Sequence, residues 1–307
     1  MPTVNQRIGV PQAMAINGVD AGGMMSARIQ AGYDNILSSE PDGLAVPVSD
    51  REIQFVRGTV VTQDWIHAID LLTGAVGTYI FYERKSGVAE ATGYIKHTIT
   101  APVIHRINID FAKGRYATIS FDFECRAVDQ TKTIADMWAM TDSQGAPTYI
   151  TAARGCWRIF STIFAQGGSP AICIYHVTAF NFSLTLPLVK ECNDSDIAYT
   201  CVDARVSGMT AIGSITFQDS AIASAKLKAE SLLLAARNAL ELNCHQSGGA
   251  TDRQIVIAGV VFDSIGGNVD VTKPFSDYSM PFRVVNNSSV PLTLDGTNKI
   301  ITTEESS

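Results

Sequence analysis

The chain has 307 residues, enough for two domains of about 150 residues each, and 17% of its residues are charged, below the roughly 25% of an average soluble domain. The net charge of −7, without a long basic cluster, argues against a protein that holds nucleic acid through phosphate contacts. No apolar run approaches the ~18 residues of a membrane-spanning helix, and no signal-peptide core follows the N-terminus, so we expect synthesis in a cytoplasm-like compartment.

The N-terminal part of the chain is predicted to be an arm followed by two strands. Residues 1–22 lack a regular pattern and end in the turn residues NGVDAGG, which predicts an irregular arm. Residues 24–33 and 51–61 are compatible with strands, and the second of them is rich in β-branched and aromatic residues.

A helix is predicted over residues 64–73, where Trp65, Ile69 and Leu72 recur at spacings of four and three. Asp64 is a good N-cap for this helix, and Trp65 is expected to pack at its start. A capping role for Asp64, and for Asp219 later in the chain, is more common than a paired functional site built from the same residues.

Two hairpins and a linker are predicted to follow. Residues 77–84 and 92–100 flank a glycine-containing loop, and residues 102–128 alternate across the turn AKGR. The turn-rich sequences TDSQGAP and AQGGSP bound a linker over residues 141–170, whose apolar middle we expect to pack on one of the domains.

The second half is predicted to repeat the element order of the first. Strands are expected over 175–188 and 197–217, and then a long helix begins near Asp219 and continues to about residue 243. One face of this helix is apolar and is a candidate for contact with another subunit; it contains Ile222, Ala229, Leu232, Ala236 and Leu240.

The chain is predicted to end in closing strands and an arm. Residues 253–271 and 277–285 have strand character, and residues 286–307 are rich in Ser, Thr and Asn. A free tail would gain nothing from apolar residues, so we expect those of this arm to be buried against a neighbouring subunit. These candidate arm contacts are Leu292, Leu294, Ile300 and Ile301.

A short sequence recurs half a chain apart. In RGTVVTQDWIHA and IGSITFQDSAIA, Gly58 aligns with Gly213, and the following residues are similar up to a shared Gln-Asp. The offset is 213 − 58 = 155 residues, and the order of predicted elements agrees as well. Both observations favour a tandem duplication.

A β-barrel or sandwich domain with one helix beside it, used twice, resembles the tail-tube fold of tailed bacteriophages and related contractile injection machines. The stretch INGVDAGGMMSARIQAGYDNI is similar to the opening of such proteins, with a first strand after a short arm. The resemblance covers most of residues 20–290, but its motifs are architectural. It implies a mainly β (α+β) fold with two tandem tail-tube-like domains, each with a flanking helix. The boundaries expected are an arm at 1–22, domains at 23–140 and 171–285 around the 141–170 segment, and a second arm at 286–307.

The resemblance implies a structural virion protein. Family members with two tandem domains form three-membered rings with pseudo-sixfold symmetry, and stacked rings form the channel for DNA ejection. The partners implied are copies of the same chain and other tail or baseplate proteins, with assembly in the host cytoplasm and DNA passing without specific binding. The family has no catalytic residue and no cofactor to transfer. A baseplate hub or distal-tail ring protein of the same fold is the alternative.

A cytosolic β-rich enzyme or ligand-binding protein is the rival class. His67 with Asp64 or Asp70 is the candidate dyad, but no GxSxG motif or phosphate-binding glycine loop accompanies it. The cysteines and histidines are scattered and not clustered as metal ligands are. We therefore expect no enzyme activity, no cofactor and no metal.

For a ring that passes DNA, the acidic net charge of the chain further predicts a channel wall that is negative or nearly neutral.

Overall fold

The fold is taken from a computed structural model of the whole chain. It describes residues 8–21, 24–38, 48–63, 68–69, 72, 77–125, 133–147, 157–165, 172–174, 176–191, 201–204, 208–218, 238–246, 252–268, 272, 275–285, 292–293 and 298–305. Below, "first half" means the described residues up to Gln144, and "second half" means those from Trp157 onward.

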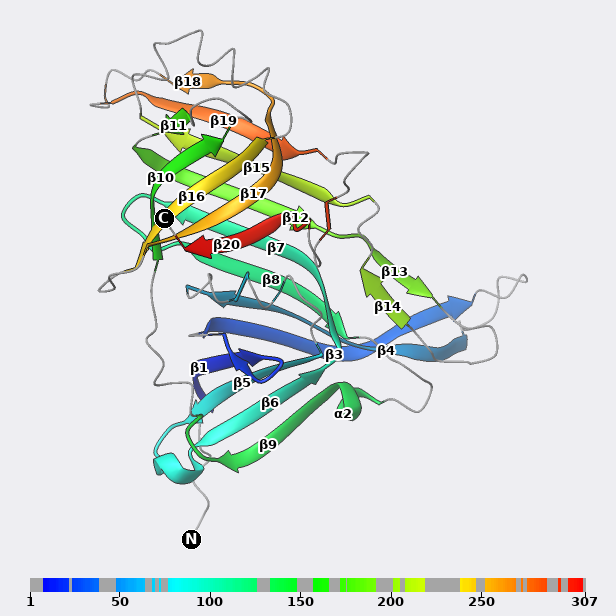
Figure 1. Cartoon of the computed structure of the whole chain (residues 1–307). Helices are drawn as coiled ribbons and strands as arrows, with labels where there is room; N and C mark the ends of the chain where they lie inside the picture. The colour runs from blue at the N-terminus through cyan, green and yellow to red at the C-terminus, as the bar shows by residue number, and fades with distance from the viewer. Residues whose placement is uncertain are drawn as a thin grey trace.

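The described chain is mainly β (Figure 1). The strands of the first half are β1 (Ile8–Ile16), β2 (Val19–Asp20), β3 (Met24–Ser38), β4 (Val48–Thr62), β5 (Thr78–Lys85), β6 (Tyr94–Thr100), β7 (Pro102–Ala112), β8 (Thr118–Cys125) and β9 (Trp138–Gln144). Those of the second half are β10 (Trp157–Ala165), β11 (Ile172–Ile174), β12 (Val177–Thr185), β13 (Leu188–Glu191), β14 (Cys201–Ala204), β15 (Thr210–Phe217), β16 (Asn238–Gln246), β17 (Asp252–Phe262), β18 (Gly266–Asn268), β19 (Asp277–Val284) and β20 (Ile301–Glu305). Two short helices, η1 (Glu90–Thr92) and α2 (Ile134–Met137), lie in the first half.

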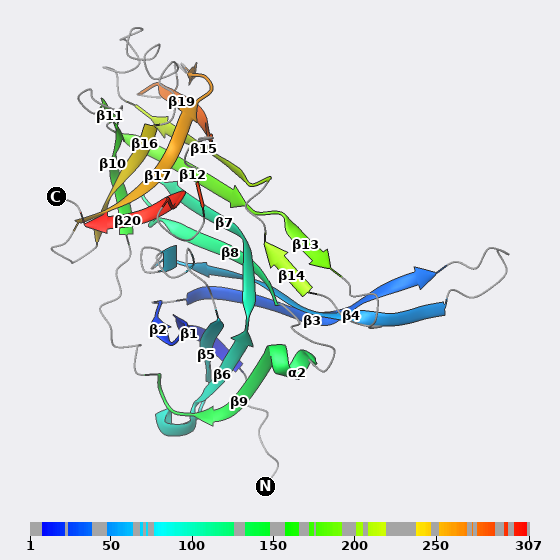
Figure 2. The same cartoon turned by 45° about the vertical axis from the view of Figure 1, so that its right-hand side comes forward.

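The strands form three antiparallel sheets. A 13-stranded sheet runs in the order β11-β10-β16-β17-β19-β15-β12-β7-β8-β4-β3, with β18 paired to β19 and β20 paired to β17. A 5-stranded sheet has the order β2-β1-β5-β6-β9, and β13 pairs with β14. The large sheet contains strands of both halves, and β3 and β4 extend beyond its other strands as a long ribbon (Figure 2). These sheets are open, and the described strands do not close into the barrel that was one of the two expected architectures.

The strand pairings of the first half recur in the second half. The order β3-β4-β8-β7 in the first half matches β12-β15-β19-β17 in the second. The order β2-β1-β5-β6-β9 likewise matches β11-β10-β16-β17-β20. In this match the long strand β17 corresponds to β6 over most of its length and to the start of β7 at its end, where it pairs with β19. Gly58 pairs with Phe123, and Gly213, which aligns with Gly58 in sequence, pairs with Phe282.

Irregularities of register recur at the same places. The β3–β4 pairing shifts between Met24 and Ser26, and the β12–β15 pairing shifts between Val177 and Ala179. The β1–β5 pairing has a shift directly before Ala13, and the corresponding β10–β16 pairing has one directly before Ser161. A bulge places one extra residue in one strand of a pair and locally increases its twist, so the two halves bend at equivalent points.

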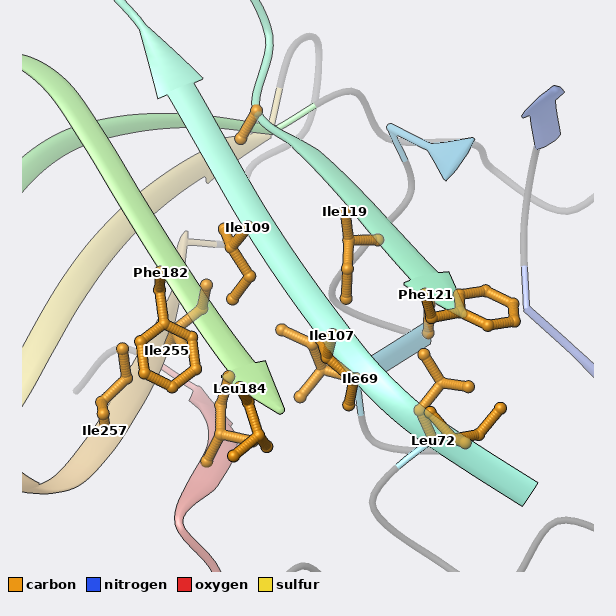
Figure 3. Close-up of a cluster of buried hydrophobic side chains, with 14 of the residues drawn as sticks. Ile69, Leu72, Ile107, Ile109, Ile119, Phe121, Phe182, Leu184, Ile255 and Ile257 are labelled. Carbon is orange, nitrogen blue, oxygen red and sulfur yellow. The ribbon is translucent and has the colours of Figure 1, made fainter. Parts of the chain in front are cut away.

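The core lies between the large sheet and the strands packed over one of its faces. Figure 3 shows side chains of β7, β8, β12 and β17 gathering with Ile69 and Leu72. Ala68, Ile69 and Leu72 have helical backbone and are buried, as the predicted helix over 64–73 requires for its apolar side. Asp64 and Trp65 lie outside the described residues. The predicted hairpins β5–β6 and β7–β8 are confirmed.

The prediction of an irregular N-terminal arm is wrong. β1 pairs along β5, and the residues from Ala13 to Ile16 are completely buried in the core. The segment lacks a regular strand pattern because its pairing with β5 contains two register shifts. The 141–170 segment also contains strand: β9 extends to Gln144, and β10 pairs with β16 as an integral part of the large sheet.

Two expectations for the second half are also wrong. The long helix does not reach residue 243, because residues from Asn238 onward form β16 between β10 and β17. The C-terminal segment is no outward-lying arm where it is described, since β20 pairs with β17 and Ile300 and Ile301 are completely buried in the chain's own core. In both segments, pairing with strands that are distant in the sequence determines the secondary structure.

Candidate functional site

One face of the large sheet is polar across seven adjacent strands, from β3 to β19. Along β7 the buried residues Ile107 and Ile109 alternate with the less buried Arg106, Asn108 and Asp110. An antiparallel sheet with one covered face and one face toward water has this pattern. We call this surface the polar face. It also includes Ser26, Arg28 and Gln30 of β3, Arg57 and Thr59 of β4, Ser120, Asp122 and Glu124 of β8, Asn181, Ser183 and Thr185 of β12, Ser214 and Thr216 of β15, Asp277, Ser279 and Arg283 of β19, and Asp263 directly after β17.

Side chains of the polar face are hydrogen bonded across the strands. The Ser183 hydroxyl donates to Asn108 Oδ1 at 2.7 Å, and Asn108 Nδ2 donates to Ser120 Oγ at 3.3 Å. Farther along the sheet, Asn181 Nδ2 donates to Ser214 Oγ at 2.9 Å. Such cross-strand pairs each add roughly 0.2–1 kcal/mol to sheet stability. These short, uncharged side chains cover the central strands.

The charges of the polar face nearly cancel. Among its described residues, four arginines stand against five carboxylates, and an ion pair joins Arg283 Nε to Asp263 Oδ1 at 3.3 Å. These residues are Arg28, Arg57, Arg106 and Arg283, and Asp110, Asp122, Glu124, Asp263 and Asp277. Apart from the exposed Ile212 of β15, the surface is therefore hydrophilic, without a strong field of either sign.

The two halves of the described chain join by strand pairing only between β7 and β12. Residues from Arg106 to Ala112 pair with residues from Ala179 to Thr185 in an unbroken register. We call this contact the internal junction. It continues the core on one side of the sheet, where Ile109 lies opposite Phe182, and the polar face on the other, where Asn108 lies opposite Ser183.

Four strands of the large sheet have one described strand partner each. Within the described chain β3 pairs with β4 alone, β18 with β19 alone, β11 with β10 alone, and β20 with β17 alone. All three residues of β18 are exposed, as are Arg28 and Gln30 of β3. Unpaired backbone N–H and C=O groups of such edges are templates for pairing with another chain.

A hollow of about 340 Å³ lies beside the β3 edge. Its lining includes the guanidinium groups of Arg28 and Arg57, the imidazole of His105 and the carboxylate of Asp122. Thr59 donates a 2.6 Å hydrogen bond to this carboxylate, and the Arg57 guanidinium lies 3.7 Å from the centre of the Phe55 ring. The open shape and mixed charge suit a surface contact with a polar partner.

A buried histidine in the first half has a structural role. The His97 ring stacks on Phe81 with centroids 4.2 Å apart. The Trp138 indole N–H donates to His97 Nδ1 at 3.2 Å, so Nδ1 carries no proton and Nε2–H donates to Glu83 at 3.3 Å. The equivalent positions of the second half hold Ile255, Leu242 and Ile301, which are buried and apolar. One fold thus tolerates either a satisfied polar cluster or a purely apolar one.

Two other buried groups are suited to packing and not to chemistry. Complete burial raises the pKa of Tyr79, whose hydroxyl lies 3.2 Å from the Met24 sulfur. Burial, with a smaller contribution from the Glu124 charge, strongly raises the pKa of Cys125. A thiol held protonated in this way is a poor nucleophile and a poor metal ligand. No cluster of metal-ligating side chains is found among the described residues.

The structure does not bring the predicted site residues together. Leu240 lies in β16, where it is fully buried, and Leu292 packs against the same core as Ile300 and Ile301. Leu240, Ile300 and Ile301 are core residues of this chain, and Leu292 packs on that core while partly exposed. The other candidates fall outside the described residues: Asp64, His67, Asp70, Trp65, Asp219, Ile222, Ala229, Leu232, Ala236 and Leu294.

The polar face and the internal junction were not predicted from the sequence. A signal for them was present, since Asn108 and Asp110 alternate with apolar residues in one strand and Asn181 and Ser183 do so in another. Alternation does not predict that these two strands are neighbours, because residues 108 and 183 lie far apart in the sequence.

No protein-family model matches the chain, and no curated protein sequence matches it. Within the described part of the chain, no helix has the length and apolar character needed to cross a membrane.

Proposed function

We propose that this chain is a structural protein that associates with copies of itself, head to tail, into a closed ring of the tail-tube type found in tailed bacteriophages. The observation that carries the proposal is the repeated set of strand pairings joined by the internal junction. A chain that already joins two equivalent halves side by side can join further copies by the same geometry. Repetition of one head-to-tail contact closes a ring when the rotation per step divides the circle.

The same repetition supports the finer reading of two tandem tail-tube-like domains that arose by duplication. With two such units in each chain, a ring of six units contains three chains and has pseudo-sixfold symmetry. Joining two units covalently removes part of the entropy cost of association. The low charge content of the chain fits a protein whose surface is largely covered by neighbouring copies.

The polar face is proposed to line the channel of the ring. The other face of the large sheet is already covered by the core, so the polar face is the one available to an aqueous lumen. Uncharged hydroxyl and amide groups, with balanced charges, would give DNA phosphates little to bind. This wall fits the passage of DNA without specific binding, and no catalytic step or cofactor is proposed.

Negative-stain images and the molar mass of the purified full-length chain test the proposal. We expect rings with a central hole and a mass of three chains. Stacking of these rings into tubes would assign the protein to the tube body, and single unstacked rings would assign it to a hub or distal-tail ring. A protein that stays monomeric at high concentration would contradict the proposal and favour a cytosolic enzyme or ligand-binding protein.

A further inference from the structure

We propose that β18 of one chain pairs antiparallel with β3 of a second copy, with Gly266 opposite Gln30 and Asn268 opposite Arg28. We call this contact the external junction. The inference rests on the self-association part of the proposed function and deepens it, because it names the two strands, their register and the side chain that bridges them. It holds whether or not the assembled ring belongs to a virion.

The position of β18 corresponds to the outer part of β7. Asn108 of β7 pairs with Ser120, and Gly266 of β18 pairs with Ser279. Ser120 pairs with Val61, which follows Gly58 by three residues, and Ser279 pairs with Thr216, which follows Gly213 by three residues. Gly266 therefore occupies the register position of Asn108.

The position of β3 corresponds to β12. Gln30 pairs with Arg57, directly before Gly58, and Ser183 pairs with Ile212, directly before Gly213. Gln30 therefore occupies the register position of Ser183. Because Asn108 lies opposite Ser183 at the internal junction, the same geometry places Gly266 of one chain opposite Gln30 of the next.

The apolar side of β3 is incompletely covered within one chain. Its core-facing residues Ala27, Ile29 and Ala31 are only partly buried. Their counterparts in β12 are almost completely buried under the same core with β7 alongside: Phe180, Phe182 and Leu184. A second copy would supply the missing neighbour, placing its Ile265 and the Tyr278 ring, which covers Gly267, against this side.

The polar side offers complementary shapes. At the internal junction the Asn108 side chain bridges Ser183 and Ser120. At the external junction Gly266 has no side chain, and a Cβ placed there would meet nothing within 4 Å. Gln30 is longer than Ser183 and exposed, so its amide can extend over Gly266 toward Ser279 and replace the bridge that Asn108 makes.

A second copy is the occupant that fits both edges at once. Each chain carries one β3 edge and one β18 edge, so pairing one with the other repeats indefinitely or closes a ring. Arg28 opposite Asn268 places a guanidinium beside a neutral amide, so this register brings no like charges together. Pairing would also cover the exposed edges at β3 and β18.

Disulfide cross-linking of the full-length protein tests the register. Antiparallel partners have Cα atoms about 4.5–5.5 Å apart, within disulfide range, whereas a two-residue offset increases the separation to about 8 Å. The matched variants are Gln30→Cys/Gly266→Cys and Arg28→Cys/Asn268→Cys. The mismatched variants, Gln30→Cys/Asn268→Cys and Arg28→Cys/Gly266→Cys, contain the same four substitutions.

We expect both matched variants to form covalent trimers on non-reducing gels under mild oxidation, at least about tenfold faster than the mismatched variants and the wild-type chain. Rings that form without matched cross-linking, or with faster mismatched cross-linking, would overturn the register while leaving the proposed function standing. Absence of any oligomer in all variants and in the wild type would overturn both. Matched cross-linking into open chains of increasing length would support the external junction and exclude ring closure.

Single substitutions test the bridging role. Gln30→Ala should weaken assembly about fivefold per junction, the effect of losing one hydrogen bond, with unchanged thermal stability of the dissociated chain. Thr210→Ala is the control, since Thr210 is exposed on the polar face but lies on β15, inside the sheet. Equal assembly of Gln30→Ala and the wild type would remove the bridge from the proposal.

Discussion

The Phe123 ring lies across Gly58, its neighbour on the adjacent strand, so that a Cβ at Gly58 would stand 2.8 Å from the ring and 2.6 Å from the Arg28 carbonyl oxygen. Phe282 lies across Gly213 in the same way, and there the nearest carbonyl belongs to Asn181. The glycine that aligns between the halves thus has one purpose in both. It lets a strand and an aromatic ring approach more closely than any side chain permits.

Gly58→Ala and Gly213→Ala should each destabilise the chain. The added methyl group has no room beside a backbone oxygen and a buried ring, so we expect a loss of about 1–3 kcal/mol in the free energy of unfolding. Urea denaturation measures this loss. Gly145→Ala is the control, because a Cβ there meets only an ordinary contact at 3.6 Å, and it should change stability by less than about 0.5 kcal/mol. Equal effects at the three positions would contradict the close-approach explanation.

Ile301→Ala should lower the free energy of unfolding by about 2–5 kcal/mol, because Ile301 is completely buried in β20. Its neighbour Thr302 lies on the other side of the same strand and is only partly buried, so Thr302→Ala should cost much less. Chemical denaturation of the two variants gives the comparison. Deleting residues 298–307 should likewise destabilise the fold, because it removes β20 and the buried Ile300 and Ile301. A deletion that kept full stability would show that β20 contributes nothing.

His97→Ala should destabilise the first half by about 2–4 kcal/mol, since it opens a cavity and leaves the Trp138 indole N–H without its acceptor. Glu83→Gln should cost less than about 1 kcal/mol, because the amide oxygen still accepts from His97 Nε2–H. The indole NMR signal of Trp138 reports the lost hydrogen bond, and it should move in His97→Ala and stay in Glu83→Gln. An unmoved signal in His97→Ala would contradict the assigned tautomer.

The ion pair of Lys85 with Asp142 predicts a pH-dependent part of the stability. The 2.6 Å hydrogen bond from Lys85, together with the Ser143 backbone N–H, lowers the pKa of Asp142 below its usual value. A carboxyl group with a lowered folded pKa stabilises the fold above its unfolded pKa of about 4, and this contribution is lost as the pH falls through the folded pKa. Asp142→Asn should therefore lower stability at neutral pH and reduce the loss of stability as the pH falls below about 4. Parallel pH profiles for the variant and the wild type would contradict this.

Local pattern in the sequence determined much of the sheet. Alternation of apolar and polar residues gives the hairpins β5–β6 and β7–β8, whose partners are neighbours in sequence and whose turns contain glycine. The aligned Gly58 and Gly213 indicated the repeat, because close approach to an aromatic ring accepts no other residue.

Only the tertiary structure decided which distant segments meet. Leu240 belongs to an Ala- and Leu-rich stretch whose spacing suits a helix, yet its backbone hydrogen bonds go to β10 and β17, and strand pairing prevails over local preference. Ile300 and Ile301 are buried in the chain's own core. Burial under a neighbouring subunit would require the same apolar residues, so the sequence pattern does not distinguish the two locations. At the internal junction Asn108 pairs with Ser183 and their side chains are hydrogen bonded. Neither residue type by itself predicts that β7 and β12 are neighbours.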